Sequence, residues 1–245
     1  MTLFLTSSPC IYKHSPATLT EANGFLSRIR SKLPPKPNTL FVASSPAKED
    51  HTQTDFYCGD MAGAFERALI DLGDWQILDD LTADRARELI AWSDFIILMG
   101  GHVPTQNAFF QRVGLKRLLT GYPGVIMGIS AGTMNAAEVV YAQPEADGES
   151  SPSFLRFYPG LGLTEIMVCP HYQEVVEKNM TVDGIPIYPD ITAADSHRGY
   201  PFHVFPDGTY IYKDENEYAI YGQCWRYHNG ILEQLTKDGE RLDLQ

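Results

Sequence analysis

The sequence has no run of apolar residues long enough to cross a membrane, and its first residues lack the basic segment that opens a secretory signal. It is also poor in positive charge, with 19 Lys and Arg against 31 Asp and Glu, a net charge of −12. An acidic surface of this kind repels phosphate backbones. We therefore expect a cytoplasmic protein with neither a membrane nor a nucleic acid as its partner.

Cysteine is scarce, and the metal and nucleotide motifs are missing. The four cysteines, which form no CxxC pair, are Cys10, Cys58, Cys169 and Cys224. In a chain of this length we expect them to be reduced and mostly buried, without disulfides. No HExxH, Gly-x-Gly-x-x-Gly or phosphate-loop pattern occurs. The sequence therefore predicts no metal site and no cofactor.

The first two-thirds of the chain alternates apolar strand patterns with helical patterns. Strands are predicted at 2–8, 39–45, 75–81, 94–99 and 125–129, and helices at 20–33, 59–72, 83–92 and 107–119. Several strands are apolar on both faces, as in a parallel sheet covered by helices. This order predicts an α/β fold with a doubly wound, mostly parallel sheet, whose ligand site lies beyond the carboxyl ends of the strands.

The last third reads as β-hairpins. Turn signals occur at Pro206-Asp207-Gly208, His228-Asn229-Gly230 and Lys237-Asp238-Gly239, between β-rich segments. No linker or repeat divides the chain. We expect a single domain over residues 1–245, with antiparallel C-terminal hairpins against one edge of the sheet.

A candidate nucleophile lies where the strand at 125–129 meets a helical segment. Gly128, Ser130 and Gly132 form the pattern G-x-S-x-G. A sharp strand-to-helix turn lifts a serine hydroxyl above the sheet edge, and glycines on either side let strand and helix approach closely. The backbone N–H of Ala131 then faces the place where an oxyanion would form. We predict that Ser130 is a nucleophile, against the alternative of a tight turn with a capping serine.

Serine needs a base, and a second glycine turn offers a second oxyanion donor. His171 ends the predicted strand that begins at Ile166, so we expect it at the carboxyl edge of the sheet as the general base. Gly100 and Gly101 follow another strand and precede His102, which is the rival base. The residue types alone leave the acid open among Glu145, Asp147 and Asp195.

Three segments together resemble the peptidase E and cyanophycinase family of serine peptidases, over roughly residues 38 to 235. They are Gly128–Gly132, Met99–His102 and Cys169–Tyr172. The resemblance implies a fold like the class I glutamine amidotransferase domain and cleavage of peptide-like bonds without a cofactor. It also implies Ser130 as nucleophile, His171 as base, and Gly101 with Ala131 as oxyanion donors.

The sequence departs from the related families at several positions. Glutamine amidotransferases use Cys as nucleophile and Glu two residues after their His, where this chain has Ser130 and Gln173. Glutamine hydrolysis of that type is therefore not expected. The Gly-Gly-Asn of the peptidase family is Gly100-Gly101-His102 here.

The resemblance gives two locations for the acid. Peptidase E proper takes it from between the serine and the histidine, which implies Glu145 or Asp147. Cyanophycinase-like relatives take it from an acidic motif after the histidine, which Ala193-Ala194-Asp195 resembles. We favour Asp195.

The resemblance to peptidase E also implies an arginine shortly after the histidine, to hold the carboxylate of an N-terminal aspartate. Residues 172–192 contain no arginine and only Lys178, which cannot form a bidentate fork. Arg156 or Arg198 would have to replace it. Aspartyl dipeptidase specificity is therefore not favoured.

The sequence thus predicts a serine peptidase that acts on small peptides through an acyl-enzyme. The alternatives are a cyanophycinase-like or esterase activity, and a non-catalytic binding module on an amidotransferase-like scaffold. The sequence leaves open whether the chain forms a homodimer.

Overall fold

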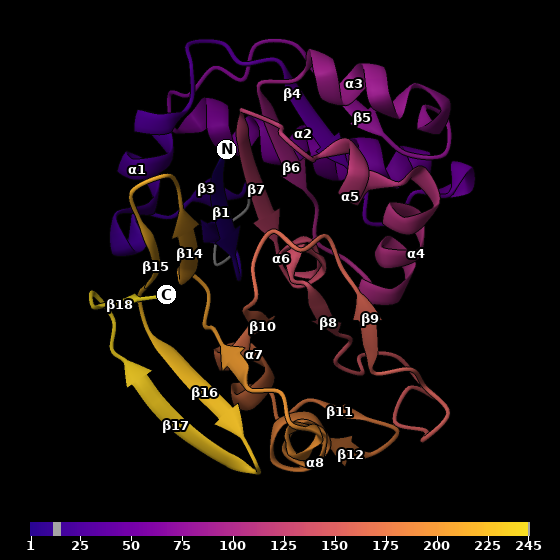
Figure 1. Ribbon diagram of the computed structural model, residues 1–245, viewed down its shortest axis with the longest axis vertical. Helices are drawn as coiled ribbons and strands as arrows, with labels where there is room; N and C mark the ends of the chain where they lie inside the picture. Colours follow the sequence, from indigo (N-terminus) through magenta and orange to yellow (C-terminus); the bar gives the residue numbers. More distant parts are fainter. Residues whose placement is uncertain (12–15, 245) are drawn as a thin grey trace.

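A mixed eight-stranded sheet forms the centre of the protein in the computed structural model, which describes residues 1–11 and 16–244. Five neighbouring strands are parallel, in the spatial order β1, β7, β6, β4, β5 (Figure 1). Their bounds are β1 Thr2–Thr6, β4 Thr39–Val42, β5 Trp75–Leu78, β6 Phe95–Leu98 and β7 Val125–Ile129. These strands confirm the predicted parallel sheet.

Three strands from the last third of the chain extend this sheet beyond β1. They are β14 Tyr210–Lys213, β15 Tyr218–Tyr221 and β18 Arg241–Asp243, and each pairs antiparallel with its neighbour. The expected C-terminal hairpins at one edge are therefore present. Because β14 runs antiparallel to β1, its first residues lie beside the carboxyl end of β1, with Tyr210 opposite Thr6.

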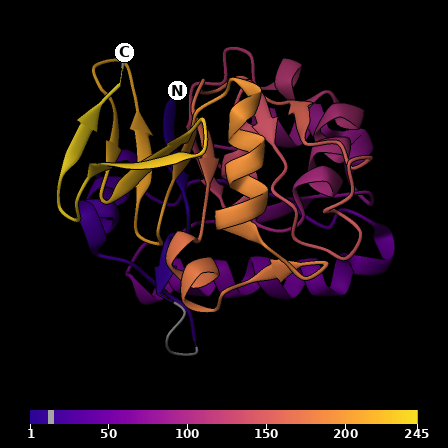
Figure 2. The same cartoon turned by 90° about the horizontal axis from the view of Figure 1, so that it is seen from below.

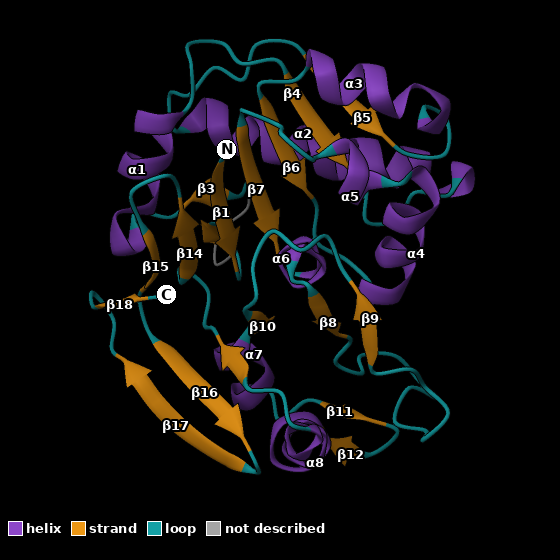
Figure 3. Cartoon of the chain, viewed as in Figure 1, coloured by secondary structure: helices purple, strands orange, loops and turns teal. Residues whose placement is uncertain are grey.

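Helices cover both faces of the sheet (Figures 2 and 3). On one face, α1 (Phe25–Lys32) and α2 (His51–Arg67) pack on strand residues such as Phe4, Phe41 and Met127. On the other face, alternate strand residues such as Leu3 and Leu5 pack against four further helices. These are α3 Ala86–Trp92, α4 Val103–Val113, α5 Leu115–Leu118 and α6 Ala131–Ala136. Short 3-10 turns precede α1, α2 and α3 at Ala22–Gly24, Lys48–Asp50 and Ala83–Arg85.

Two predicted helices have different bounds in the structure. The helix expected at 59–72 begins at His51 and ends at Arg67. It ends before residue 72 because Leu69 has a left-handed φ of 58° and an exposed side chain that joins no apolar face. The helix expected at 107–119 begins at Val103 and is divided after residue 113, where Gly114 has φ 66°. A glycine with positive φ is a common helix terminator.

A second sheet lies beside the first, in the order β10, β13, β16, β17. Its strands are β10 Met167–Cys169, β13 Phe202–Val204, β16 Cys224–His228 and β17 Ile231–Thr236. The strand that precedes His171 therefore belongs to this second sheet. From the sequence, we had expected this strand to belong to the central sheet. In Figure 1 this sheet and the elements around it occupy the lower half of the molecule.

Short elements complete the fold. They are the pairs β2 Cys10–Ile11 with β3 Thr18–Leu19, β8 Val139–Tyr141 with β9 Phe157–Pro159, and β11 Thr181–Val182 with β12 Ile185–Pro186, together with α7 Tyr172–Glu177, the π-helical turn Ile187–Thr192, α8 Ala193–Asp195 and the 3-10 turn Ser196–Arg198.

Two sequence-based expectations about composition can be compared with the structure. All four cysteines are buried, and Cys58, Cys169 and Cys224 carry free thiols. Burial raises the pKa of the Cys58 thiol to about 12, so this thiol stays protonated and unreactive at neutral pH. Among the described residues, none of the helices is long and apolar enough to span a membrane.

His203, in β13 opposite Arg226, predicts a pH dependence of stability. Burial, aided by the charge of Arg226, lowers its pKa from 6.5 to about 4. As the pH falls through 6.5 the unfolded chain takes up the proton first, so stability is lost between pH 6.5 and 4. We expect wild type to lose about 1–2 kcal/mol more than His203→Leu between pH 7.5 and 5, in urea unfolding. Equal losses in both proteins would contradict this.

Candidate active site

Three neighbouring parallel strands place polar groups at one edge of the central sheet. Ser7 follows β1, Ser130 follows β7, and Gly101 lies shortly after β6. Because these strands are adjacent and parallel, the segments after them meet at the carboxyl edge (Figure 1). The site is therefore where the strand pattern predicted it.

Ser130 lies in a sharp turn between β7 and α6. Its backbone has φ 49° and ψ −111°, a conformation that is strained for a residue with a Cβ. A methyl group at Gly128 would lie 2.9 Å from Cα of Thr133, and one at Gly132 would lie 2.2 Å from the carbonyl oxygen of Leu98. The two glycines of the motif are thus required by close backbone contacts.

His171 lies within hydrogen-bonding distance of Ser130. Nε2 of His171 is 2.9 Å from Oγ of Ser130, and Nδ1 is 2.8 Å from Oδ1 of Asp207. An ionised carboxylate only accepts hydrogen bonds, so Nδ1–H donates to Asp207 and Nε2 is left to accept from the serine hydroxyl. The imidazole is therefore held in the tautomer that a general base needs.

Ser7 contacts all three of these residues. Its carbonyl accepts a hydrogen bond from the N–H of Ser130 at 3.1 Å, and its Oγ accepts one from the N–H of His171 at 2.9 Å. The same hydroxyl donates to Oδ1 of Asp207 at 2.8 Å. Ser7 is fully buried. It therefore fixes the backbone of two partners and the carboxylate of the third, and nothing in the sequence pattern singled it out.

Asp207 comes from the turn between β13 and β14. Because β14 is antiparallel to β1, this turn lies at the same edge as Ser7. The N–H of Asp207 donates to Oε1 of Gln173 at 3.0 Å. Burial alone would raise the pKa of Asp207, but hydrogen bonds and the charge of His171 outweigh it, so the pKa lies below its ordinary value. The carboxylate therefore stays ionised beside the imidazole at neutral pH.

The acids favoured by the sequence lie elsewhere. Asp195 is buried, where its Oδ2 accepts hydrogen bonds from the Tyr141 hydroxyl and from Nε of Arg156, both at 2.9 Å. Arg198 lies 3.4 Å from its other oxygen. These three partners engage the Asp195 carboxylate, whereas the carboxylate within hydrogen-bonding distance of Nδ1 of His171 is that of Asp207.

The two other candidate acids also do not pair with His171. Glu145 lies in the wall of a cavity beside Ser130, and Asp147 is exposed in the loop that follows. The signal that could have found Asp207 is its position in the Pro206-Asp207-Gly208 turn, just before a strand that extends the central sheet. By itself, the Pro-Asp-Gly pattern predicts only a chain reversal.

The glycine turn after β6 lies directly against the serine. A methyl group at Gly100 would lie 3.3 Å from Cβ of Ser130, and one at Gly101 would lie 2.6 Å from Cβ of Ser44. His102, the rival base, is engaged on both ring nitrogens. Its Nε2 lies 2.7 Å from Oε1 of Glu149, and its Nδ1 lies 2.7 Å from the hydroxyl of Thr105. His102 thus does not contact Ser130 and instead fixes the end of this turn.

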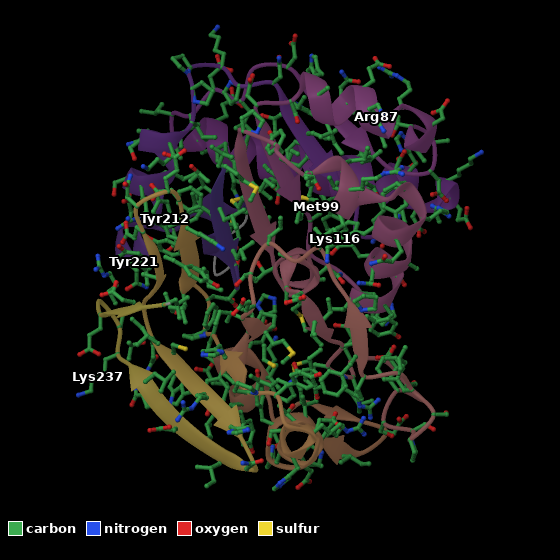
Figure 4. All side chains as sticks on the ribbon, in the orientation of Figure 1. Arg87, Met99, Lys116, Tyr212, Tyr221 and Lys237 are labelled. Atoms are coloured by element: carbon green, nitrogen blue, oxygen red, sulfur yellow. The ribbon has the colours of Figure 1, made fainter. Side chains whose placement is uncertain are left out.

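Two cavities meet at Ser130 and His171. The larger, of about 580 Å³, extends toward Tyr57, Asp60 and Met99. Of these three residues, Figure 4 labels Met99. The smaller, of about 170 Å³, is bounded by residues of α7, of the loop that follows β8, and of α4. Both also reach Gly101. A substrate could therefore extend on either side of the serine hydroxyl.

Within residues 1–11 and 16–244, the His, Cys, Asp and Glu side chains form no group of three or more that could hold a metal ion.

The fold and the hydrogen-bonded series Ser130, His171, Asp207 define the class of protein as one with a serine-hydrolase type of site on an α/β scaffold. Comparison with known families agrees with this class. The chain belongs to Peptidase family S51, which residues 3–220 match. None of the curated proteins compared with the chain matches it.

Two solved structures resemble the protein over nearly its whole length. A peptidase from an acI-B1 Actinobacterium superposes with a TM-score of 0.62 at 16% identity, covering 99% of this chain and 96% of that one. A putative peptidase E protein from Listeria monocytogenes EGD-e superposes with a TM-score of 0.57 at 18% identity, covering 96% of this chain and 98% of that one. These similarities confirm the fold predicted from the sequence.

The position of Asp195 predicts a structural role. Removing one partner of a buried ion pair leaves the other charge uncompensated, so Asp195→Ala should lower the free energy of unfolding by about 3–5 kcal/mol. Asp147→Ala, in an exposed loop, should change it by less than about 0.5 kcal/mol. Urea unfolding at neutral pH measures both. An Asp195→Ala protein as stable as wild type would refute this role.

Proposed function

We propose that the protein is a serine peptidase that cleaves small peptides through an acyl-enzyme on Ser130. The observation that carries the proposal is the position of His171, with one ring nitrogen 2.9 Å from the serine hydroxyl and the other 2.8 Å from Asp207. Membership of Peptidase family S51 supports the reaction class.

In the first half of the proposed reaction, Nε2 of His171 takes the proton of Ser130 as Oγ attacks the peptide carbonyl. Asp207 stabilises the imidazolium that forms. The tetrahedral intermediate then collapses, the C–N bond breaks, and His171 gives its proton to the leaving amine. The acyl group is left as an ester on Ser130.

In the second half, His171 takes a proton from water, and the resulting hydroxide attacks the ester. Collapse of this intermediate returns the proton to Oγ of Ser130 and releases the acid. The enzyme is regenerated without a metal or a cofactor, because each proton transfer passes through the same imidazole.

The oxyanion of both intermediates needs donors, and we assign these to the backbone N–H groups of Ala131 and Gly101. Ala131 is the first residue of α6, where N–H groups lack partners within the helix. Gly101 reaches both cavities beside Ser130. Removal of one such donor costs a factor of about 10²–10³ in kcat in serine peptidases.

The small-peptide preference rests on the size of the cavities. The space on one side of the serine is only about 170 Å³, below the range of about 300–1,000 Å³ that holds a drug-sized ligand. It is suited to one side chain or one terminal residue.

Ser130→Ala tests the nucleophile. The hydrolysis of a mixture of dipeptides can be measured through the amine that is released. In the variant we expect this hydrolysis to fall to background, a loss on the order of a million-fold in kcat. A fluorophosphonate should label wild type at Ser130 and leave the variant unlabelled, while the melting temperature stays nearly unchanged. Wild type that neither reacts with the probe nor cleaves peptides would instead support a non-catalytic module, and hydrolysis of p-nitrophenyl esters alone would support an esterase.

Asp207→Asn tests the acid. The amide cannot hold Nδ1–H in the same tautomer, so kcat should fall by about 10⁴-fold with a small change in KM. Asp195→Asn is the matched control, because it makes the same chemical change at the other candidate acid. When Asp195→Asn is assayed below its melting temperature, its kcat per folded molecule should stay within about tenfold of that of wild type. The reverse order of effects would restore Asp195 as the orienting acid.

A further inference from the structure

The smaller cavity beside Ser130 is walled mostly by apolar side chains. Its lining includes Val103, Met134, Val175, Met180 and Ile187. The acidic side chains in its wall are Glu145 and Glu174. An apolar pocket with a carboxylate in its wall suits a ligand group that is aliphatic along its length and positively charged at its end.

Within the described parts of the chain, Glu145 forms no ion pair with a lysine or an arginine. Its carboxylate accepts a hydrogen bond from the backbone of Val103. The histidines whose charge acts on it are His102 and His171, which are hydrogen-bonded to Glu149 and Asp207. Although the residue as a whole is exposed, desolvation raises the pKa of Glu145, and together with the charge of Glu149 it outweighs the opposing charges of His102 and His171. A bound cation would offset that cost.

The other acids around the two cavities already have partners. Glu174 forms an ion pair with Lys178, and Asp60 lies 3.6 Å from Arg67. Asp207 is bonded to His171. Glu145 is therefore the carboxylate in these walls that is left to pair with a ligand.

The basic residues that could hold an acidic substrate are engaged elsewhere. Arg156 and Arg198 both lie against Asp195, and Lys178 pairs with Glu174. Neither cavity has a lysine or arginine among its described lining residues. A substrate carboxylate in the smaller cavity would thus face Glu145 with no compensating charge.

Glu145 is also held in place by its own loop. The backbone N–H groups of Glu145 and Ala146 donate to Oε2 of Glu149 at 2.9 Å and 3.1 Å. Nη1 of Arg156 donates to the carbonyl oxygen of Glu149 at 2.7 Å. A carboxylate on an anchored backbone pays less entropy when it pairs with a ligand.

We propose that the smaller cavity is a subsite for a basic side chain, lysine or arginine, next to the scissile bond, and that Glu145 selects it by pairing with the cationic end. This proposal rests on the proposed peptidase activity and adds its substrate class. The methylene stem packs on the apolar wall, while the charged end reaches Glu145.

The test compares peptides that carry lysine, its uncharged analogue norleucine, or glutamate on either side of the cleaved bond. In wild type we expect kcat/KM for lysine to exceed that for norleucine by about 10- to 100-fold at one of the two positions, with glutamate the poorest. In Glu145→Gln the lysine preference should fall to within about threefold, while cleavage of the norleucine peptide is kept. Higher salt should weaken the wild-type preference.

Asp147→Asn is the matched control. It removes one negative charge from the same loop, at an exposed position outside both cavities, so the lysine preference should remain. A loss of preference in this variant as well would point to the overall charge of the surface and overturn the role of Glu145.

A second readout does not need a cleaved peptide. Lysinamide should slow fluorophosphonate labelling of wild-type Ser130 more than norleucinamide does, and this difference should vanish in Glu145→Gln. If labelling and cleavage occur without any preference for lysine, the subsite is wrong while the peptidase stands. If the probe does not label Ser130 and no peptide is cleaved, the proposed function fails and the subsite with it.

Discussion

The site depends on one hydrogen-bonded imidazole, which connects two sheets. His171 follows β10 of the second sheet, whereas Ser130 follows β7 of the central one. Their contact requires the two sheets to keep the same relative position at the site. Buried Ser7 helps to fix that position. Its hydroxyl is hydrogen-bonded to the backbone of His171 and to the carboxylate of Asp207, and its carbonyl accepts from the N–H of Ser130. The geometry of the candidate nucleophile is thus set at the end of β1, far from it in sequence.

Backbone strain is concentrated at the same point. Ser130 and His171 both have positive φ, at 49° and 58°, which costs about 1–3 kcal/mol for each residue that is not glycine. Such conformations persist only where surrounding contacts determine them. Here the contacts are the ladder of β1 with β7, the close packing at Gly128 and Gly132, and the bonds to Ser7. In these strained conformations the side chains of Ser130 and His171 point toward each other, with Oγ and Nε2 2.9 Å apart.

The sequence predicted what depends on local pattern. The parallel strands carry continuous apolar runs, and the turn at Ser130 carries its two glycines, so the order of strands and helices and the position of the serine follow from a few residues each. His171 was found because it ends an apolar run. The start of the helix at His51–Arg67 was misplaced because Phe56 and Tyr57, the aromatic side chains of its first two turns, are exposed and do not continue its apolar face.

Asp207 and Asp195 show why the acid could not be chosen in this way. Both are single carboxylates in the last third of the chain, and what separates them is pairing across long stretches of sequence. Asp207 reaches the site because β14 pairs antiparallel with β1, while Asp195 is neutralised by Arg156, which lies 39 residues before it. A sequence pattern read over ten or twenty residues indicates neither the pairing of β14 with β1 nor that of Asp195 with Arg156.

The same reasoning separates the scaffold from the substrate. The central sheet positions the serine and the glycine turn, and Ser7 at the end of β1 holds the backbone of His171 beside them. Much of the wall of the smaller cavity comes from other elements, among them α7 and the loop of residues 143–156. In that loop the arginine that could have bound an acidic group is bonded to Asp195 and to the backbone carbonyl of Glu149. The guanidinium of Arg156 therefore helps to hold the loop from which Glu145 extends toward the cavity. Fold and family thus constrain the chemistry at Ser130, whereas the polarity of its surroundings is a property of this chain.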